Sequence, residues 1–514
     1  MPDLFNSQLA GVDWLIIACY FAVIIAIGAL ASRGTSDEDG FFLGGRKMPA
    51  WAVAMSFAAT ALSAATFIGG PEYAYKKDLT LLVYELGKVL GALLVCALLL
   101  PPIYRAGCST VYGYLGQRVS PGASTAASVV FLIGRVLASG ARLFIAGTAF
   151  SYILYDMLDP SSLITAIVVF GAIGTLYTVM GGIKAVIWTD TLQLIVVVGA
   201  LLVSMVLLLD AIPLPIGDLF DVLQAEGKTK LVEPGIDLSG EGALFDFSRG
   251  DTLLAAIALT FFFAAAFGTD HDMAQRLLTC KSLKHSIGSL IGATLIALPI
   301  TVLFMFTGLL LFVFYARPDV MGDAAPALAV ADGREVYPQY LLHELPIGLR
   351  GLAMAGLFAA AMSSLDSAIN AMASSAISDV IQPIRRRFGH ETQAKEAGAA
   401  TASRGMVVVM GVVLTLSAIV MSLMYDPQED TLIPFALGVM TFAYAGLFGV
   451  FLCVILTGQG STWSVIAALL VGMAVIAGSR YLDLLSGLSI AWPYWMVLAS
   501  AASFVVCMLG SSRK

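Results

Sequence analysis

Apolar segments long enough to cross a lipid bilayer recur along almost the whole chain. Hydrophobic residues make up 59% of the 514 residues and charged residues only 12%, and the mean hydropathy is +0.89. A soluble protein carries about 25% charged residues, and its helices rarely stay apolar for about 20 residues. We therefore predict an all-α integral membrane protein that is surrounded by lipid and has no separate soluble domain.

Thirteen transmembrane helices are predicted from these segments. They cover residues 10–31, 50–76, 79–104, 121–155, 161–180, 184–209, 251–277, 284–315, 338–382, 403–424, 431–457, 462–480 and 487–510.

The charges between the apolar segments predict how the chain is oriented. Cytoplasmic loops of membrane proteins are enriched in Lys and Arg. Basic residues such as Arg105, Arg118 and Lys184 fall in alternate loops, whereas the loop at about 210–250 is dominated by acids such as Asp218 and Asp221. With thirteen spans, the N-terminus is expected outside and the C-terminus inside a bacterial cytoplasmic membrane. No basic patch suggests nucleic acid, and no obligate protein partner is evident.

Two of the predicted helices are expected to be discontinuous. In residues 55–75, small and hydroxyl side chains lead into Gly69, Gly70 and Pro71, and in residues 261–276 an apolar run breaks at Gly268. Each of these helices opens a set of five. Interrupted helices at corresponding positions of two halves indicate an inverted-repeat transporter with a midplane binding site. The alternative is that glycines merely let membrane helices pack closely.

A polar stripe runs through the apolar segment "FAAAMSSLDSAINAMASS". Its members are spaced by four, three and four residues, so they share one face of a helix: Ser363, Ser367, Asn370 and Ser374. Asp366 flanks this stripe, and Asp190 is a second acid inside a predicted span. A carboxylate at the bilayer centre costs at least about 2.5–3.5 kcal/mol, so each needs a partner, water or an ion.

Two interpretations of these oxygens stay open at this point. Hydroxyls, carbonyls and carboxylates are hard ligands that suit a cation such as sodium. Alternatively, the serines bond within their own helix while Asp366 forms an ion pair with one of three basic residues: Arg135, Arg142 or Lys88.

Six sequence pieces in register resemble the sodium:solute symporter family, which includes sodium/proline, sodium/galactose and sialic acid symporters. In order they read "FFLGGRKMPAW", "SAATFIGG", "GARLF", "GGIKAVIWTDTLQ", "DMAQRLLTCKS" and "AAAMSSLDS". The resemblance covers about residues 40–460 and implies a LeuT-like core with a five-plus-five inverted repeat.

The resemblance also implies a division of the chain. We expect an extra transmembrane helix and a loop in 1–40, the first repeat in 41–210, an extracytoplasmic loop in 211–250, the second repeat in 251–457 and two C-terminal helices in 458–514.

By the same resemblance, sodium ions are the expected cofactors, one or two in number. The first sodium site would take carbonyls or hydroxyls from Ala59, Leu62, Ala360, Ser363 and Ser364. A possible second site would use Asp190, Asp366 and Ser367. Relatives commonly have Ser or Thr at the position of Asp366, so the extra carboxylate would either strengthen a second cation site or hold a proton.

The solute is less well defined by the resemblance. Candidate contacts are Thr66, Tyr84, Glu85, Arg142 and Asp270. Tyr84 and Glu85 match a Tyr-Glu pair of the galactose symporter, whereas "GARLF", with Arg142, is similar to the proline and pantothenate symporters. Arg142 could attract a carboxylate, or it could neutralise a buried acid.

The sequence thus predicts a sodium-coupled symporter that imports a small polar organic solute, namely a sugar, an amino acid or a small carboxylate, by alternating access. It is not expected to be an enzyme. The alternatives are proton coupling, or an intramembrane aspartyl protease with Asp190 and Asp366 as its dyad. In "GTDHDMAQR", Arg276 is expected near the inner surface, in the gate or in helix packing.

Overall fold

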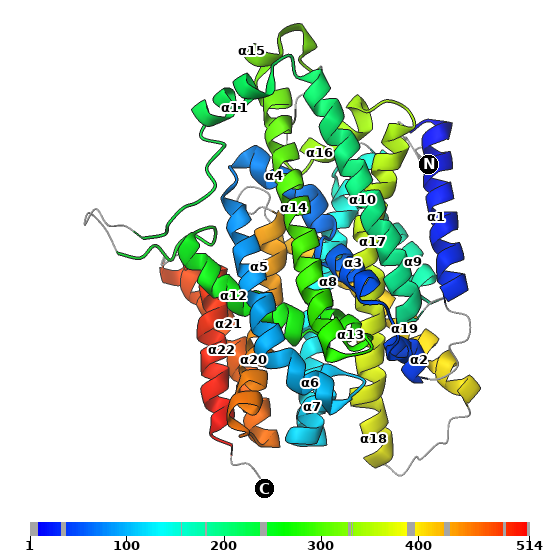
Figure 1. Cartoon of the computed structure of the whole chain (residues 1–514), viewed down its shortest axis with the longest axis vertical. Helices are drawn as coiled ribbons and strands as arrows, with labels where there is room; N and C mark the ends of the chain where they lie inside the picture. The colour runs from blue at the N-terminus through cyan, green and yellow to red at the C-terminus, as the bar shows by residue number, and fades with distance from the viewer. Residues whose placement is uncertain are drawn as a thin grey trace.

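In the computed structural model the chain is a bundle of long helices, with no β-strand in the part of the chain that the structure describes (Figure 1). The described residues are 9–31, 38–155, 157–179, 182–236, 244–326, 330, 333–387, 396–425, 432–486 and 490–510. The prediction that the N-terminus lies outside and the C-terminus inside the membrane concerns the two ends of the chain, which lie outside the described residues.

The first half of the bundle follows an edge helix, α1 (Gly11–Ala31). Its elements are α2 (Glu38–Leu43), η1 (Gly44–Arg46), α3 (Ala50–Ala61), α4 (Ala64–Lys76), η2 (Thr80–Leu82), α5 (Val83–Leu94), η3 (Val95–Leu99), α6 (Leu100–Ala106), α7 (Val111–Arg118), α8 (Pro121–Tyr155), α9 (Pro160–Thr178), α10 (Ile183–Ala211) and α11 (Ile216–Ala225).

The second half begins with another broken helix. Its elements are α12 (Leu253–Gly268), α13 (His271–Leu278), α14 (Leu283–Ala316), α15 (Pro318–Met321), η4 (Gly322–Ala324), α16 (Val336–Gln339), η5 (Tyr340–Glu344), α17 (Leu349–Ser375), η6 (Ala376–Ile381), α18 (Gln382–Arg387), α19 (Glu396–Met424), α20 (Leu432–Thr457), α21 (Thr462–Ser486) and α22 (Trp492–Met508).

The helices match the predicted transmembrane segments. Nine described helices are long and apolar enough to cross a membrane, two bent pairs each make a further span, and two shorter apolar helices remain. Each predicted segment therefore has a counterpart. The spans α3/α4 to α10 form the first set of five and α12/α13 to α20 the second.

The first break does not lie where the sequence suggested. The helix bends by 55° between α3 and α4, at Leu62 and Ser63, whereas Gly69, Gly70 and Pro71 are inside α4. The glycines instead allow close packing, because a Cβ on Gly69 would lie 2.9 Å from a side-chain carbon of Ile433. The second break follows Gly268 as predicted, with a bend of 58°.

The predicted span 338–382 is also divided. The turns α16 and η5 end before Pro346, and α17 starts after Gly348, whose φ of +89° favours glycine. Asp13 of α1 caps this start, because its carboxylate accepts hydrogen bonds from the amides of Gly348 (2.7 Å) and Gly351 (2.9 Å). Asp13 thereby stabilises the start of α17, because the first amides of a helix have no acceptor within the helix.

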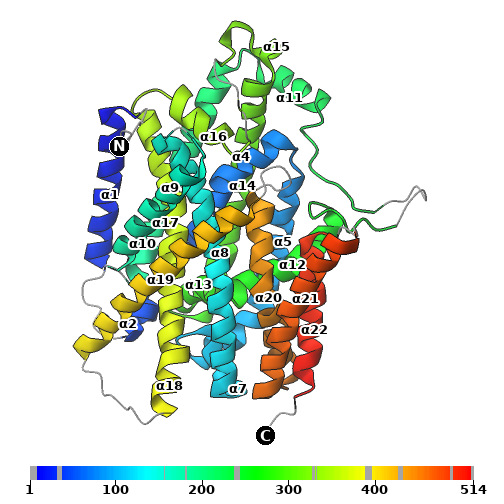
Figure 2. The ribbon, with the colours of Figure 1, turned by 180° about the vertical axis from the view of Figure 1, so that it is seen from behind.

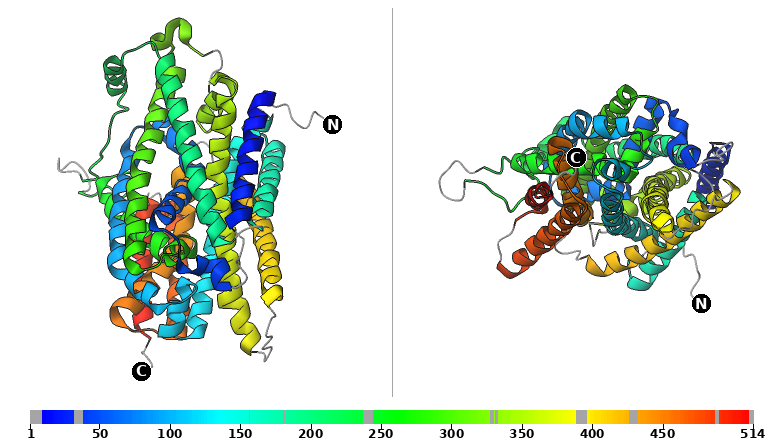
Figure 3. Two further views of the ribbon diagram at one scale, coloured as in Figure 1. Left: turned by 45° about the vertical axis from the view of Figure 1, so that its right-hand side comes forward. Right: turned by 90° about the horizontal axis from the view of Figure 1, so that it is seen from below.

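Helix α17 is the centre of the bundle. Of its most apolar window 94% is buried, compared with 22% for α1, and the views from the front and back place α1 at one edge and α21 and α22 at the opposite edge (Figures 1 and 2). Figure 3 shows the same helices side-on and from below. A helix that touches protein on every side can carry polar residues without exposing them to lipid.

Candidate functional site

Two serines of α17 contact the end of α3. The Ser363 hydroxyl lies 3.2 Å from the carbonyl oxygens of Ala59 and Ala360, and the Ser364 hydroxyl lies 3.4 Å from the carbonyl of Thr60. All of these residues are buried. The structure thus gathers most of the oxygens predicted for the first sodium site, from helices some 300 residues apart.

The broken helix makes these carbonyls available. The last carbonyls of a helix have no partner within it, and the amide of Leu62 reaches back only to Ala58. The carbonyls of Ala59 and Thr60 can therefore face α17. Leu62 lies in the break, adjoining this group, and Thr60 is a neighbour that sequence reasoning did not name.

Close to these serines, the buried guanidinium of Arg276 contacts several helices. It donates to groups from α3, α10, α13 and α17: Ser56 Oγ (2.9 Å), Thr60 Oγ1 (2.7 Å), Asp190 (3.3 Å), Asp272 (3.0 Å) and Ser367 Oγ. Arg276 is fully buried, and its bonds to four helices agree with the predicted role in helix packing. Asp272, one helical turn before it, draws its side chain inward.

A second buried arginine holds the start of α13. Arg135 of α8 forms ion pairs with Asp270 (2.8 Å) and Asp272, and the Tyr444 hydroxyl also donates to Asp270. Asp270 caps α13 by accepting from the Asp272 amide at 2.9 Å. The α12/α13 break is therefore fixed by α8 and α20, and Asp270 is fully engaged within the protein.

Carboxyl groups outnumber guanidiniums in this buried cluster. It contains four carboxyl groups, Asp190, Asp270, Asp272 and Asp366, and two guanidiniums, Arg135 and Arg276. Among the described residues, Asp190 Oδ1 and Asp366 Oδ2 have no hydrogen-bond partner.

Among the described residues, Asp366 bonds only to its neighbour Ser367. Its Oδ1 accepts from the amide (2.6 Å) and hydroxyl (3.2 Å) of Ser367. Within the described residues, no ion pair joins Asp366 to Arg135, Arg142 or Lys88. The ion-pair interpretation of Asp366 is therefore wrong. The other part of that alternative agrees with the structure, because the hydroxyls of Ser363 and Ser367 donate to the carbonyls of Ala360 (3.2 Å) and Ser363 (2.7 Å) within α17.

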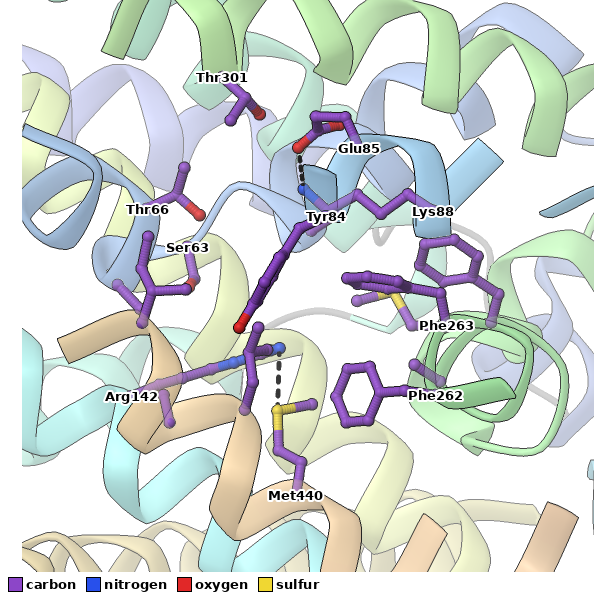
Figure 4. Close-up of a pocket in the computed structure, with 18 of the residues that line it drawn as sticks. Ser63, Thr66, Tyr84, Glu85, Lys88, Arg142, Phe262, Phe263, Thr301 and Met440 are labelled. Carbon is purple, nitrogen blue, oxygen red and sulfur yellow. Dashed lines mark hydrogen bonds and ion pairs between the residues drawn. The ribbon is translucent and has the colours of Figure 1, made fainter. Parts of the chain in front are cut away.

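A cavity opens between the two breaks (Figure 4). It leaves about 80 Å³ for the centres of water molecules and is lined by residues of α4, α5, α8, α12 and α20. The predicted residues Thr66, Tyr84, Glu85 and Arg142 all line it, together with Phe262, Phe263 and Met440, whereas Asp270 does not.

The two cations in this cavity differ in their partners. Lys88 forms an ion pair with Glu85. Arg142 has only Met440 Sδ, 3.7 Å from its Nη2, and its buried Nη1 has no partner in the described part of the chain. Figure 4 shows the Tyr84 hydroxyl directed toward Arg142. An unpaired guanidinium in an aromatic cavity is a binding group for an anion.

Tyr84 also lines a wider cavity of about 540 Å³, together with Lys77, Arg249, Asp251 and Trp492. The rings of Tyr84 and Trp492 meet edge to face, with centroids 6.1 Å apart. Burial raises the pKa of Asp251, but hydrogen bonds from Arg249, Tyr73 and Thr80 outweigh it and hold the pKa below its ordinary value. Tyr84 therefore stands between the inner cavity and a charged vestibule.

Comparison with known families is decisive for the class of protein. Residues 41–467 match the model of the sodium:solute symporter family. The chain belongs to this family. Its members transport solutes with sodium, so this symporter is a multi-pass membrane protein that couples sodium to a small organic solute, and not an enzyme.

Its relatives carry different solutes. It is 26% identical over 479 residues to the sodium/sialic acid symporter SiaT of Proteus mirabilis (strain HI4320), covering 91% of this chain and 90% of that one. It is also 26% identical to the bovine (Bos taurus) sodium-coupled monocarboxylate transporter 2 over 80% of this chain and 64% of that one, and to the human (Homo sapiens) sodium/iodide cotransporter over 72% and 56%.

Solved structures show the same fold. A Na⁺-coupled sialic acid symporter, in a substrate-bound outward-open state, superposes with a TM-score of 0.78 at 21% identity, covering 97% of both chains. Mhp1, a nucleobase-cation-symport-1 family transporter in a closed conformation, gives 0.57 at 15% identity, covering 91% of this chain and 92% of that one. The fold is the predicted LeuT-like core with its five-plus-five inverted repeat.

Proposed function

We propose that this symporter imports a small organic carboxylate together with sodium, and that Arg142 binds the carboxylate. The observation that carries this proposal is the guanidinium of Arg142, which lines the cavity without a carboxylate partner among the described residues. A buried charge without a counter-ion is costly, and an arginine can bind a carboxylate through two parallel hydrogen bonds.

The rest of the cavity supports an acid with a partly apolar body. Phe262, Phe263 and Tyr84 present ring surface, while the Glu85–Lys88 pair and Thr66 supply polar groups. The solutes in the names of the relatives, sialic acid, monocarboxylates and iodide, are all anions at neutral pH. A neutral sugar would leave Arg142 unpaired.

Uptake into proteoliposomes tests the proposal. We expect an inward sodium gradient to drive accumulation of one or more acids from a panel of sialic acid, lactate, pyruvate and amino acids, but not of galactose. Arg142→Gln should reduce uptake at low solute concentration about a hundredfold, because a hydrogen-bonded charge pair is lost. Lys184→Gln, at the start of α10 and away from both cavities, is the matched control. Equal uptake of acid and neutral sugar, or no sodium dependence, would refute the proposal.

For sodium, we propose that Ala59, Leu62, Ala360, Ser363 and Ser364 form the first site. The Ser363 hydroxyl already lies 3.2 Å from the carbonyls of Ala59 and Ala360, which would share the ion, and the Ser364 hydroxyl lies 3.4 Å from the carbonyl of the adjoining Thr60. Asp190, Asp366 and Ser367 are proposed as a second cation site. The excess of buried carboxyl groups and the two partnerless oxygens support a further positive charge there.

Two substitutions separate these sites. Ser364→Ala should raise the sodium concentration for half-maximal uptake about tenfold or more, because one ligand of a charged group is lost. Asp366→Ala should lower the Hill coefficient for sodium from near two to one, or else abolish a pH dependence of uptake if a proton occupies the site. Ser374→Ala, on the same helix, is the control. A second site is refuted if Asp366→Ala changes neither measurement.

The orientation, the division of the chain and the transport cycle follow as proposals. We place the N-terminus outside and the C-terminus inside a bacterial cytoplasmic membrane, and keep the repeat boundaries at 41–210 and 251–457. The vestibule beyond Tyr84 lies next to Asp251, at the end of the acidic loop that is expected outside. Solute would enter there, and the helix groups would rock about the site.

A further inference from the structure

A second, smaller cavity lies between the proposed solute and sodium sites. Side chains of α4, α8, α9 and α17 enclose it, and Ser139, Arg142 and Ser364 supply its polar groups. Arg142 lines both this cavity and the solute cavity. One guanidinium is thus shared by the two spaces, and one wall of the smaller space is a proposed sodium ligand.

The polar groups around this cavity lack partners. The Ser139 hydroxyl is buried, with 3% of the residue exposed, and has no hydrogen-bond partner in the described structure; the same holds for Arg142 Nη1. The Ser364 hydroxyl has one long contact, 3.4 Å to the carbonyl of Thr60. Buried polar groups are nearly always satisfied by protein or by ordered water.

The space fits a single water molecule. It leaves about 10 Å³ for the centre of a water, close to the smallest volume that holds one, and a buried water needs two to four polar partners. Here three are available. The remaining wall is apolar, formed by Leu143, Phe170 and Leu365, so a water would have no other partners there.

We propose that a buried water bound by Ser139, Ser364 and Arg142 couples sodium binding to carboxylate binding. This inference rests on the proposed function. When sodium takes the lone pair of Ser364 Oγ, the hydroxyl proton turns away from the ion and donates to the water. The water accepts from Ser364 and from Arg142 Nη1, and donates to Ser139 Oγ. The guanidinium is thereby held with its other edge in the solute cavity.

Ser139 is a positioning residue in this scheme, because it touches neither ion nor solute. Sodium binding fixes Arg142 before the carboxylate arrives, which lowers the entropy cost of binding the solute. By linkage, the carboxylate raises the affinity for sodium by the same factor. Simple attraction between the sodium ion and the carboxylate would also give cooperativity, but it would not depend on Ser139.

The test measures the ratio of carboxylate affinities with and without sodium. Sialic acid and lactate are the probes, titrated calorimetrically into the purified full chain in sodium chloride and in choline chloride. Sodium alone is titrated by its effect on the melting temperature. Ser139→Ala should lower the affinity ratio about fivefold, the effect of one lost hydrogen bond, and leave the affinity for sodium alone unchanged.

Two further variants complete the design. Ala361→Val, which fills the cavity from another side, should lower the ratio in the same way while keeping the Ser139 hydroxyl. Ser151→Ala is the control, because Ser151 lies on the same helix, is buried and bonds to the carbonyl of Met157 instead.

The outcomes distinguish this inference from the proposed function. If the wild type binds an acid with sodium dependence and Ser139→Ala keeps the wild-type ratio, the water link is refuted and the symport proposal stands. If Ser139→Ala weakens binding of sodium alone, its role is structural and the inference is equally refuted. If neither probe binds in a sodium-dependent manner, the acid that the uptake panel identifies takes their place, and if that panel identifies no acid, the carboxylate proposal fails and the inference falls with it.

Discussion

Arg276 is the single residue on which the buried cluster most depends. Its guanidinium connects Asp190 of α10, Asp272 of α13 and Ser367 of α17. Buried charges pay a large desolvation cost that only well-placed partners repay. One side chain therefore bonds to all three helices, at the point where the proposed ion sites lie.

Without this guanidinium the protein should unfold more easily. We expect Arg276→Ala to lower the free energy of unfolding by about 3–5 kcal/mol, because Asp190 loses its counter-ion in a buried site. Adding Asp190→Asn should restore part of that loss, since no lone charge then remains. Melting temperatures in detergent measure both. Equal melting of Arg276→Ala and the double variant would contradict the ion-pair explanation.

At the scale of single residues, the sequence indicated which residues belong to the candidate site better than it indicated which groups each of them bonds to. Ser363, Ser364 and Ala59 were named through the resemblance of short motifs to the sodium:solute symporter family, because the polar stripe alone left hydrogen bonds within the helix as an alternative. A role in helix packing was predicted for Arg276 but its partners were not, since basic residues after an apolar run normally mark the membrane surface. The one available signal was the four-residue spacing from Asp272, which predicts an ion pair within α13.

At the level of the elements, glycines allow helices to approach closely. Gly308 of α14 packs against α4, and a Cβ there would lie 2.4 Å from the carbonyl oxygen of Pro71. Gly288 of the same helix has nothing within 4 Å of such a Cβ. Close approach through small residues is a common way for membrane helices to associate.

These two glycines make a matched pair for mutagenesis. Gly308→Ala should lower the free energy of unfolding by about 1–3 kcal/mol, because the backbone of α4 cannot move aside. Gly288→Ala should leave it unchanged or raise it by up to about 1 kcal/mol through helix propensity. Thermal unfolding in the same detergent compares them. A Gly308→Ala variant as stable as Gly288→Ala would show that the contact is unimportant.

Element positions were predictable, but the break within the first broken helix was not. Long apolar runs fix where helices cross the bilayer. The sequence signals Gly69, Gly70 and Pro71 pointed to a break one to two turns too late, because in α4 these glycines serve packing against α14 and α20. The helix bends at Leu62 and Ser63, and neither leucine nor serine breaks a helix by itself.

On the scale of the whole molecule, Asp251 links the C-terminal end of α4 to the N-terminal end of α12. Its carboxylate accepts from Tyr73 at 2.7 Å, Thr80 at 2.9 Å and Arg249 at 2.9 Å. Since these donors hold its pKa below the ordinary value, the contribution to stability is complete above the unfolded pKa of about 3.9 and is lost as the pH falls through the folded pKa.

A pH series should reveal this tie. We expect Asp251→Asn to melt below the wild type by an amount that is constant between about pH 5 and 8 and shrinks below about pH 4, where the unfolded carboxyl begins to bind a proton. Asp218→Asn, on the exposed surface of α11, should match the wild type throughout. A difference between wild type and Asp251→Asn that already shrinks at pH 6 would contradict the lowered pKa.

An aromatic contact at the roof of the vestibule joins α5 and α12 to α22. Trp492 of α22 meets Tyr84 and also Phe262, with ring centroids 5.1 Å apart in the second pair. The family match stops at residue 467, so this roof comes from beyond the shared core. A version trimmed to the two repeats would lose one wall of its own entrance, and exchanging the C-terminal helices between relatives would exchange part of the selectivity with them.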